Sequence, residues 1–542
     1  MNMKKILYIL LLAAVAQFAS AEEFTPAQKL RMAEYAIEKF YVDDVNSSEL
    51  VENAIKGMLE HLDPHSSYTD PEETSEMTEQ LDGEFEGIGI QFQMKEDTLY
   101  VIQTIAGGPS ERVGILAGDR IVMVNDTAIA GVKMKQRDIM KRLRGKKGTM
   151  VEVLVKRGNE NISFRIKRDK IPVTSIDAAY MIAPGVGYIR LSRFGEKSYQ
   201  EFMEKVKLLK KQGMERLIFD LSDNGGGYLN SATQLANEFL SAGNLIVYTE
   251  GRSSSRHATN ATGFGSLKDM KIAVVVNQYS ASASEIFSGA IQDWDRGVVV
   301  GRRTFGKGLV QRPFPFADGS LIRLTIARYY TPSGRCIQKP YDKGNDAYAR
   351  DIIDRYNNGE LTSADSIHFP DSLRYTTLRS KRVIYGGGGI MPDRFVPFDT
   401  TQYTKYYRSL VAKGVINTFS VNYVDKNRKQ LKRQYKTEED FCSRFSVSDD
   451  MVEELTQLGL REKVEINKEE LKTSAPLIRR VLKSMIARDL WTMDAYFRVY
   501  NEENDIVQEA LRIISDDALY DRVLNEGATR NTDKVSKNND TY

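Results

Sequence analysis

The sequence predicts a multidomain α/β protein in which a β-rich domain precedes a mixed α/β core and helical regions stand at both ends. The 542-residue chain is too long for one hydrophobic core, so several domains are expected. Apolar strand-like and helix-like segments alternate between residues 171 and 397, which is typical of βαβ units. Residues 84–169 favour short strands instead, and the segments that flank these two regions are helix-prone.

The first 21 residues have the pattern of a secretory signal peptide. Lys4 and Lys5 precede an apolar run, and Ala19-Ser20-Ala21 has the small residues of a cleavage site. We expect cleavage after Ala21 and export to the periplasm, with an uncleaved anchor as the alternative. No later segment has about 18 uninterrupted apolar residues, so we expect no stable membrane span.

The charge and cysteine counts exclude several classes of function. Lys and Arg number 76, and Asp and Glu number 74. The leader holds two of the lysines and no acidic residue, so the mature chain is balanced and gives no reason to expect a nucleic acid as partner. Cys336 and Cys442 could pair in an exported protein, and the sequence leaves this open. No Cys/His cluster has metal-ligand spacing, and we expect neither a metal nor a cofactor.

Residues 22–83 are predicted to form an N-terminal helical module. Apolar residues recur at helical spacing in AQKLRMAEYAIEKF, and a second helical segment starts with Ser47 or Ser48 as its N-cap. The sequence DPHSSYTDPEE, residues 63–73, breaks the helical pattern.

The β-rich region at residues 84–169 has an informative order of elements. The stretch GGPSERVGILAGDRIVMVNDTAI orders a small-residue turn, a short helix from Ser110 to Val113, a glycine turn and a strand. This order resembles a PDZ domain. In that family a Gly-x-Gly loop ahead of a strand presents backbone N–H groups to the C-terminal carboxylate of a peptide, which adds as an extra strand. Here Gly87-Ile88-Gly89-Ile90 matches that Gly-x-Gly loop. The alternative is a β-domain with a glycine turn and no ligand.

The rest of the chain divides into a core and a C-terminal part. In residues 170–400 the strand GVGYIRLS precedes the helical SYQEFMEKVKLLKKQG, and KIAVVVN precedes SEIFSGAIQDW. Such alternation predicts a mixed α/β core. Residues 401–525 are charged and helix-prone, and residues 526–542 lack apolar anchors and are predicted to be disordered.

The segment NQYSASASEIFSGA raises the question whether one of its serines is a nucleophile. Ser282 and Glu285 fit the S-x-x-E capping box that opens a helix, which is the ordinary structural role of a serine here. The same position suits catalysis, because N–H groups at a helix start favour a developing oxyanion. The serines are Ser280, Ser282, Ser284 and Ser288, and we expect Ser280, Ser284 and Ser288 to be structural.

A nucleophilic serine needs a base, and Lys307 in GRRTFGKGLVQ is the better candidate. A free lysine, with a pKa of about 10.4, is protonated at neutral pH, but burial lowers that pKa towards the roughly 7–8 useful for a base. The alternative is a solvated lysine in a Gly-Lys-Gly turn. A Ser-His-Asp triad stays open, although no histidine is well placed by sequence. The histidines are His61, His65, His257 and His368.

The same residues contain a false phosphate-binding signal. Gly301, Gly306 and Lys307 fit the start of a P-loop, G-x-x-x-x-G-K. Gly308 stands where the motif needs Ser or Thr, and the proline-containing LVQRPFPF is a poor helix start. We therefore reject nucleotide binding.

A glycine-rich loop, DLSDNGGGYL at residues 220–229, follows an apolar strand. Its glycines permit a close approach of backbone to backbone. A loop N–H could bind an oxyanion together with the N–H of Ala283, the residue after Ser282. The alternative is a flexible strand-to-helix turn.

The order of these motifs resembles the carboxy-terminal processing peptidases, also called tail-specific proteases. The leader, LDPHSSY, the PDZ-like region, DLSDNGGG, SASASEI and TFGKGLVQ follow one another, and the resemblance spans residues 45–397. It implies a crotonase-like (ClpP/crotonase) α/β protease core with Ser282 as nucleophile, Lys307 as base and Gln311 as supporting residue. The implied oxyanion donors are Gly226 or Gly227 together with Ala283.

The chain departs from this family at two positions near the site. Ser222 stands after "DL" where the family commonly has Arg, and Tyr279 stands where it has Gly. Neither change removes a catalytic group, but both affect loop packing or the substrate pocket.

The sequence thus predicts an exported serine endopeptidase whose partners are protein substrates with flexible apolar C-termini. The PDZ domain would capture the tail, and the Ser-Lys dyad would cleave through an acyl-enzyme. The alternative is a proteolytically silent, PDZ-based tail-binding scaffold. The family architecture also suggests that the PDZ domain gates the active site, in a direction that the sequence leaves open. It leaves open as well whether the protein is a homo-oligomer.

Overall fold

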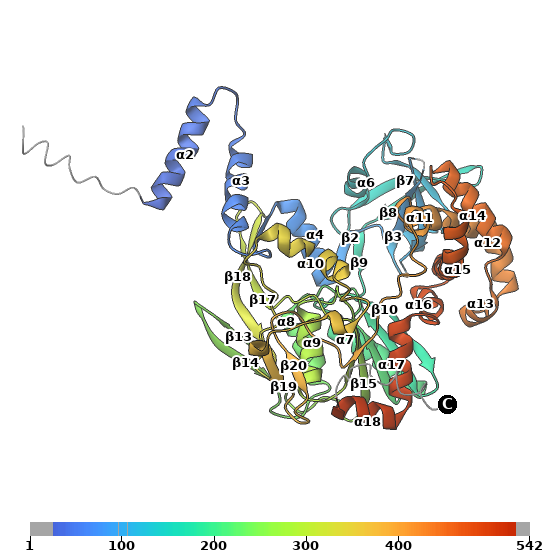
Figure 1. Ribbon diagram of the computed structural model, residues 1–542. Helices are drawn as coiled ribbons and strands as arrows, with labels where there is room; N and C mark the ends of the chain where they lie inside the picture. Colours follow the sequence, from blue (N-terminus) through green and yellow to red (C-terminus); the bar gives the residue numbers. More distant parts are fainter. Residues whose placement is uncertain (1–24, 96, 106, 527–542) are drawn as a thin grey trace, which may run out of the picture.

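The computed structural model describes residues 25–95, 97–105 and 107–526 of the 542-residue chain (Figure 1). The predicted signal peptide and the predicted disordered tail beyond residue 526 lie outside the described residues. Figure 1 shows a two-sheet core with a smaller β-domain above it, and helices at both ends of the chain.

Within the described residues, a six-stranded sheet forms the centre of the core. Its order is β10-β11-β12-β15-β16-β21, and all neighbours are parallel except β10 and β11. Every residue of β11 and β16 is buried, as their apolar sequences require of strands covered on both faces. The strands are β10 (Ile176–Ala183), β11 (Val186–Leu191), β12 (Arg216–Asp220), β15 (Lys271–Val276), β16 (Val298–Gly301) and β21 (Arg394–Phe395).

Three helices that alternate with these strands pack on one face of the sheet. Phe219 of the sheet meets Phe202 and Phe287 edge to face, with ring centroids 5.1 and 5.0 Å away. This is the βαβ arrangement that the alternation predicts. The helices are α7 (Ser198–Lys211), α8 (Leu229–Asn237) and α9 (Ala283–Asp293).

The last helices of the chain cover the other face of the same sheet (Figure 1). Val507 and Ile514 are fully buried against Ile218 and Val275 of the central strands. The end of the chain is therefore part of the core, because it covers apolar strand residues that water would otherwise reach. These helices are α16 (Met493–Asn501), α17 (Asp505–Ser515) and α18 (Asp517–Glu526).

A five-stranded antiparallel sheet of the described residues contains β17, the strand that follows the loop with Lys307 (residues 302–308, the lysine loop). Its long strand β18 pairs with β1, β13 and β17. The pairing of β1 with β18 joins the N-terminal module to the core. The strands are β1 (Ser67–Thr69), β13 (Leu245–Gly251), β14 (Ser254–Asn260), β17 (Leu309–Pro315) and β18 (Leu321–Tyr330). The connection from β18 to β21 contains α10 (Asn345–Asn357), β19 (Arg374–Thr376) and β20 (Val383–Tyr385).

The N-terminal module consists of α2 (Pro26–Phe40), α3 (Ser47–Glu60) and α4 (Pro71–Asp82), and α2 projects away from the body of the molecule (Figure 1). The prediction of Ser47 or Ser48 as N-cap is wrong. Asn46 is the N-cap, and its side chain accepts a hydrogen bond from the Glu49 N–H (3.4 Å). Sequence analysis also missed α4, whose start Asp70-Pro71 caps a helix rather than only breaking one.

The β-domain has the strand order β3-β4-β5-β7-β8, with β6 paired to β5. Leu99, Ile121 and Val153 are fully buried in its own core. A separate ribbon of β2 and β9 closes the domain at its junction with the core. The elements are β2 (Glu84–Gly87), β3 (Ile90–Lys95), β4 (Thr98–Thr104), α5 (Pro109–Val113), β5 (Arg120–Val124), β6 (Thr127–Ala128), α6 (Gln136–Leu143), β7 (Met150–Arg157), β8 (Glu160–Lys167) and β9 (Asp169–Pro172).

The helices from α11 to α15 form a separate cluster that lies against the β-domain (Figure 1). Lys95 Nζ donates to Asn422 Oδ1 (2.5 Å), and Arg120 forms an ion pair with Asp425 (3.6 Å). These contacts join two segments that are more than 300 residues apart in sequence. The helices are α11 (Lys405–Ala412), α12 (Val415–Gln434), α13 (Glu438–Arg444), α14 (Asp449–Arg461) and α15 (Lys468–Leu490).

Two further features bear on the predictions. Cys336 and Cys442 are both free thiols, so the pairing that the sequence left open does not form. Across residues 25–95, 97–105 and 107–526, no helix has the length and apolarity to span a bilayer, and no three His, Cys, Asp or Glu side chains gather as metal ligands.

Candidate active site

Ser282 occupies the turn between β15 and α9 in a strained backbone conformation. Its φ of 55° and ψ of −111° are rare for a residue with a side chain. The turn is held in place because the Ala281 N–H donates to the Asn224 carbonyl oxygen (2.9 Å) and the Phe305 N–H donates to the Ser280 carbonyl oxygen (3.0 Å). Backbone strain of this kind clusters at functional sites.

The other serines of this segment have structural hydrogen bonds, as expected. The hydroxyl of Ser280 donates to the Leu221 carbonyl oxygen (2.7 Å), and that of Ser284 donates to the Asn224 carbonyl oxygen (2.9 Å). Ser288 bonds back to the Ser284 carbonyl oxygen (2.8 Å), within its own helix. All three are fully buried, which leaves Ser282 as the partly exposed serine of the segment.

Glu285 joins the serine turn to the lysine loop. Its Oε2 accepts hydrogen bonds from the backbone N–H of Ser282 (2.8 Å) and of Lys307 (2.9 Å). Its Oε1 accepts from the Gly306 N–H (2.7 Å) and the Thr304 hydroxyl (2.5 Å). Complete burial raises the pKa of Glu285 to about 7, against the opposing effect of these donors. The capping residue that the sequence suggested therefore also holds the loop that carries Lys307.

Lys307 lies in the buried loop between β16 and β17. Burial lowers its pKa to about 8, and the positive charge of Arg323 acts in the same direction, while Glu285 and Asp63 oppose it. Lys307 itself is half-buried, which differs from the fully solvated lysine of the alternative. None of the hydrogen bonds among the described residues joins the Lys307 and Ser282 side chains, and such contacts often tighten only when substrate binds. The strand β17 follows the loop, which agrees with the rejection of a P-loop.

Tyr329 is a second residue that contacts both loops, and sequence analysis missed it. Its hydroxyl donates to the Lys307 carbonyl oxygen (2.6 Å) and lies 3.1 Å from the Ser282 carbonyl oxygen. The side chain is fully buried, and burial raises its pKa well above the usual value. The hydroxyl thus stays protonated and remains a donor.

The glycine-rich loop lies directly against the serine turn. A Cβ on Gly226 would stand 2.8 Å from Ser282 Cβ and 2.9 Å from the Ala283 nitrogen. The Gly226 N–H is already used, because it donates to Asn224 Oδ1 (2.9 Å). The N–H groups of Gly227 and Ala283 have no hydrogen-bond partner among the described residues. Of the two glycines that the family resemblance offers, Gly227 therefore has the available donor.

Gln311 lies on β17, opposite Thr325 of β18. Its Nε2 donates to Thr325 Oγ1 (3.1 Å), and that hydroxyl donates to Asp63 Oδ1 (3.0 Å). None of the hydrogen bonds among the described residues joins Gln311 to Lys307. Asp63 is 262 residues from Thr325 in the chain, and no local pattern could have indicated this contact.

His65 also lies close to the lysine loop, in contrast to the sequence-based view that no histidine is well placed. Burial lowers its pKa to about 4, with Lys307 as the next contributor. Its Nε2 bonds to the Tyr348 hydroxyl (2.8 Å), and the described residues contain no hydrogen bond from His65 to Ser282. Tyr348 accepts from Gln338 (3.3 Å), whose Oε1 accepts the Gly308 N–H (2.8 Å). His65 thus supports the lysine loop indirectly.

The loop from Gly87 to Ile90 lies in the β-domain at the start of β3. Its Ile88 carbonyl oxygen accepts from the backbone N–H and the hydroxyl of Ser110 (3.0 and 2.7 Å). The Gly89 carbonyl oxygen accepts the Ile105 N–H (3.0 Å), and Gly89 has a φ of 74°. The N–H groups of Ile88 and Gly89 have no partner among the described residues, as a carboxylate-binding loop requires.

Ser222 and Tyr279 are the two residues near the site that depart from the family pattern. Ser222 donates its N–H to Asp220 Oδ1 (2.8 Å), and Arg190 of β11 bonds to Asp220 (2.9 Å) and Asp223 (3.1 Å) on either side of it. An arginine from another strand thus lies between these two carboxylates. Tyr279 is half exposed beside the serine turn.

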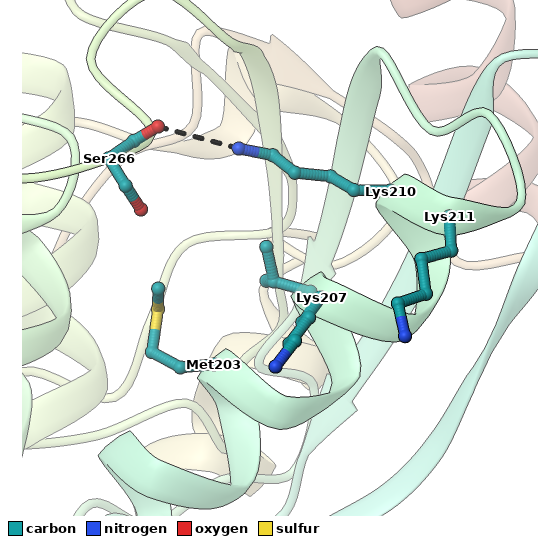
Figure 2. A pocket seen from close by; sticks show the side chains of 6 residues that line it. Met203, Lys207, Lys210, Lys211 and Ser266 are labelled. Atoms are coloured by element: carbon teal, nitrogen blue, oxygen red, sulfur yellow. Dashed lines mark hydrogen bonds between the residues drawn. The ribbon is translucent and has the colours of Figure 1, made fainter.

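An open depression on the surface of α7 holds none of these residues. Figure 2 shows its three lysines and the bond from Lys210 Nζ to the Ser266 carbonyl oxygen (3.5 Å). It is lined by Met203, Val206, Lys207, Lys210, Lys211 and Ser266.

Comparison with known proteins agrees with the motif order. Residues 185–344 match peptidase family S41, residues 87–167 match the PDZ domain, and residues 12–74 match the N-terminal domain of the activating protease CtpB. A "Probable CtpA-like serine protease" of Staphylococcus epidermidis is 36% identical over 318 residues, which are 58% of this chain and 64% of the relative. Residues 185–344 are thus a peptidase domain of family S41, and the chain is similar to the carboxy-terminal processing peptidases. The family and the PDZ domain predicted from sequence are thus confirmed.

A second curated relative and two solved structures are also similar to this chain. A "Probable CtpA-like serine protease" of Staphylococcus aureus is 38% identical over 299 residues, covering 55% of this chain and 60% of the relative. The chain therefore matches a little under two thirds of the length of these curated relatives. Among solved structures, the photosystem II D1 C-terminal processing protease is 28% identical, with 62% of this chain and 91% of that chain covered and a TM-score of 0.33. The PDZ domain of a Vibrio cholerae carboxy-terminal protease is 30% identical over 16% of this chain and 97% of that chain, with a TM-score of 0.15.

The C-terminal part of this S41 peptidase has a match of its own. Residues 406–492 match a family of unknown function (DUF8443). The matched segment runs from α11 to α15 and ends before the helices that cover the core sheet.

Proposed function

We propose that this S41 peptidase is an exported, periplasmic serine endopeptidase in which Ser282 is the nucleophile and Lys307 the base. One observation carries the proposal. A single carboxylate oxygen of Glu285 binds the backbone N–H of both residues, while burial lowers the pKa of Lys307 to about 8. With that pKa, about a tenth of the Lys307 amines are neutral at pH 7, and these can accept a proton.

The first half of the reaction forms an acyl-enzyme. The neutral Lys307 amine takes the proton of the Ser282 hydroxyl as its oxygen attacks the carbonyl carbon of the scissile peptide bond. The carbonyl oxygen becomes an oxyanion, which the N–H groups of Gly227 and Ala283 bind. The C–N bond then breaks, the Lys307 ammonium gives its proton to the leaving amine, and an ester on Ser282 remains.

The second half hydrolyses this ester. Lys307, neutral again, takes a proton from a water molecule as the water oxygen attacks the ester carbonyl. The resulting oxyanion occupies the same donors, and its collapse breaks the bond to the Ser282 oxygen. Lys307 returns the proton to Ser282, and a peptide with a new C-terminal carboxylate leaves. Gln311 supports Lys307 in both halves by accepting a hydrogen bond from the amine.

The PDZ domain would supply substrate capture. The unpaired N–H groups of Ile88 and Gly89 suit a C-terminal carboxylate, and the strand that follows Gly89 suits addition of an extended apolar tail to the sheet. In this proposal the core is a crotonase-like protease fold, and the PDZ domain gates access to it. A change in basal activity on deletion of residues 84–169 would support gating, and an unchanged rate with every substrate would count against it.

The test compares the wild type with Ser282→Ala and Lys307→Ala on an unfolded protein such as casein. We expect both variants to lose cleavage while keeping the thermal unfolding midpoint of the wild type. Substantial cleavage by pure Ser282→Ala would overturn the mechanism. Binding of a labelled tail peptide without cleavage, in wild type and Ser282→Ala alike, would instead support the silent scaffold. Mass spectrometry of exported proteins from cells with either form would then identify trimmed C-termini.

A further inference from the structure

We propose that Asp63 fixes the orientation of the Gln311 side-chain amide through Thr325, so that the segment Asp63–Ser66 is a positioning part of the catalytic centre. The inference rests on the proposed function, because it assigns a role in the Ser282–Lys307 reaction. It explains why DPHSS, part of a motif that carried no function in the sequence, lies beside the lysine loop.

Two consecutive hydrogen bonds link Gln311 to Thr325 and Thr325 to Asp63. Gln311 and Thr325 are cross-strand partners on β17 and β18, and Nε2 of the glutamine lies 3.1 Å from the Thr325 hydroxyl. That hydroxyl lies 3.0 Å from Asp63 Oδ1. The N-terminal segment thus reaches the third member of the proposed catalytic group through one intervening side chain.

The surroundings of Asp63 fix the direction of these hydrogen bonds. Oδ1 also accepts the backbone N–H of His65 (2.9 Å) and of Ser66 (3.0 Å), and Oδ2 accepts the Ser66 hydroxyl (2.6 Å). A carboxylate can only accept, so the Thr325 hydroxyl must donate to Asp63. The Thr325 oxygen is then left to accept, and its remaining partner has to be a donor.

The donor that Gln311 offers is its amide nitrogen. The direction of the hydrogen bonds from Thr325 to Asp63 therefore decides which way the Gln311 amide faces. With Nε2 turned to Thr325, Oε1 is the free end of the side chain, and it accepts no hydrogen bond from any described residue. A reversed amide would place two oxygens against each other at Thr325. The network therefore selects one of the two amide orientations.

This orientation matters for the base. A neutral amine accepts a proton through its single lone pair, so Lys307 can act only when its N–H groups point elsewhere. The Gln311 oxygen can accept one of those N–H groups and leave the lone pair for Ser282. A reversed amide would offer N–H donors that compete for the same lone pair.

The same segment also fixes the position of the strand that carries Thr325. The Ser66 hydroxyl accepts the Thr325 backbone N–H (3.1 Å) and donates to Asp63, and Ser67 begins the strand β1 that pairs with β18. Thr325 is therefore held through its backbone as well as its hydroxyl. Removal of the hydroxyl alone should leave this strand pairing in place.

The test measures kcat and KM of the full chain on a fluorogenic peptide, with Ser282→Ala as the blank. Thr325→Val removes the hydroxyl and keeps the branched shape. We expect its kcat to fall about 10- to 100-fold with KM within about threefold of wild type. Asp63→Asn, which can donate where Asp63 only accepts, should lower kcat in the same way. Thr325→Ser, which keeps the hydroxyl, should recover kcat to within about threefold of wild type.

A second comparison separates positioning from general damage. In a Gln311→Ala background, Thr325→Val should have no further effect on kcat, because its role acts through Gln311. An equal loss in both backgrounds, an equal loss in Thr325→Ser and Thr325→Val, or an unchanged kcat in Thr325→Val would overturn the inference. If Thr325→Val fails to fold, Asp63→Asn alone and in the Gln311→Ala background decides in its place.

These outcomes are distinct from a failure of the proposed function. Cleavage by the wild type that is absent from Ser282→Ala upholds the function, and an unchanged Thr325→Val then overturns the positioning role alone. Absence of any Ser282-dependent cleavage overturns the function and the inference together.

Discussion

The backbone N–H groups of Ser282 and Lys307 are hydrogen-bonded to the same carboxylate oxygen, Oε2 of Glu285, at 2.8 and 2.9 Å. The two residues are 25 positions apart in sequence and lie on different loops of the core. A shared acceptor fixes the position of one loop relative to the other, which is what proton transfer between their side chains requires.

Glu285→Gln should abolish most activity although it replaces only one carboxylate oxygen with an NH₂ group. Both carboxylate oxygens accept hydrogen bonds from donors, so a side-chain NH₂ group must face an N–H or a hydroxyl at one of them. We expect kcat/KM to fall about 100-fold or more as the two loops separate. Steady-state kinetics on a fluorogenic peptide measure this. Wild-type kinetics in this variant would show that Glu285 is only a helix cap.

Activity should depend on pH through Lys307. The base must be neutral, and burial places its pKa at about 8, so kcat/KM should rise with pH and level off above about 8. Glu285, with a pKa of about 7, loses its acceptor role on protonation and should steepen the fall below that pH.

Arg323 offers a control on that assignment. Its positive charge disfavours the Lys307 ammonium and lowers the pKa of Lys307, so Arg323→Gln should raise this pKa and move the rising limb to higher pH. The pH dependence of kcat/KM for the two proteins measures the shift. A limb that moves to lower pH would contradict the assignment of the limb to Lys307.

Gly226→Ala and Gly225→Ala form a matched pair in the glycine loop. A Cβ on Gly226 would stand 2.8 Å from Ser282 Cβ and 2.9 Å from the Ala283 nitrogen, whereas a Cβ on Gly225 meets nothing within 4 Å. Gly226 also has a φ of 102°, which disfavours alanine. We expect a loss of about 100-fold or more in kcat for Gly226→Ala and a change within about twofold for Gly225→Ala. Similar kinetics in the two variants would argue against an oxyanion role for this loop.

Tyr329→Phe should weaken both stability and catalysis. The hydroxyl is the donor for the Lys307 carbonyl oxygen in a fully buried position, so its removal should cost about 1–3 kcal/mol of the free energy of unfolding. We expect kcat to fall about tenfold as the lysine loop relaxes. The matched control is Tyr330→Phe, since the Tyr330 hydroxyl has no hydrogen bond among the described residues. Denaturant unfolding and kinetics of both variants decide, and an equal effect of the two changes would rule out a specific role of Tyr329.

Much of the core could be predicted from local patterns. The apolar strands of the central sheet and the helices between them are recognisable because burial on both faces demands continuous apolar strands. The role of most serines in the segment NQYSASASEIFSGA could also be predicted from the sequence. Ser280, Ser284 and Ser288 have the structural bonds expected of them, and Ser282 has a strained backbone that no pattern in the sequence indicates.

The start signals of helices were harder to place. Asn46 rather than Ser47 caps α3, because adjacent capping residues compete and the entry angle of the chain decides between them. In the sequence, Asp70-Pro71 indicates a break in the helical pattern, although the same pair begins α4. The first error concerns one residue, whereas the second leaves out the 12-residue helix α4.

By itself the sequence determined the order of the motifs, the family, and the identity of Ser282, Lys307 and Gln311 as candidates. These depend on residue types and spacings that are local in the chain. Only the tertiary structure decided that Glu285 and Tyr329 join the two loops, that Asp63 reaches Thr325 across 262 residues, and that the last helices cover the core sheet. Hydrogen bonds and apolar contacts between distant segments form only when the chain folds, because chain folding rather than sequence spacing brings their atoms within reach.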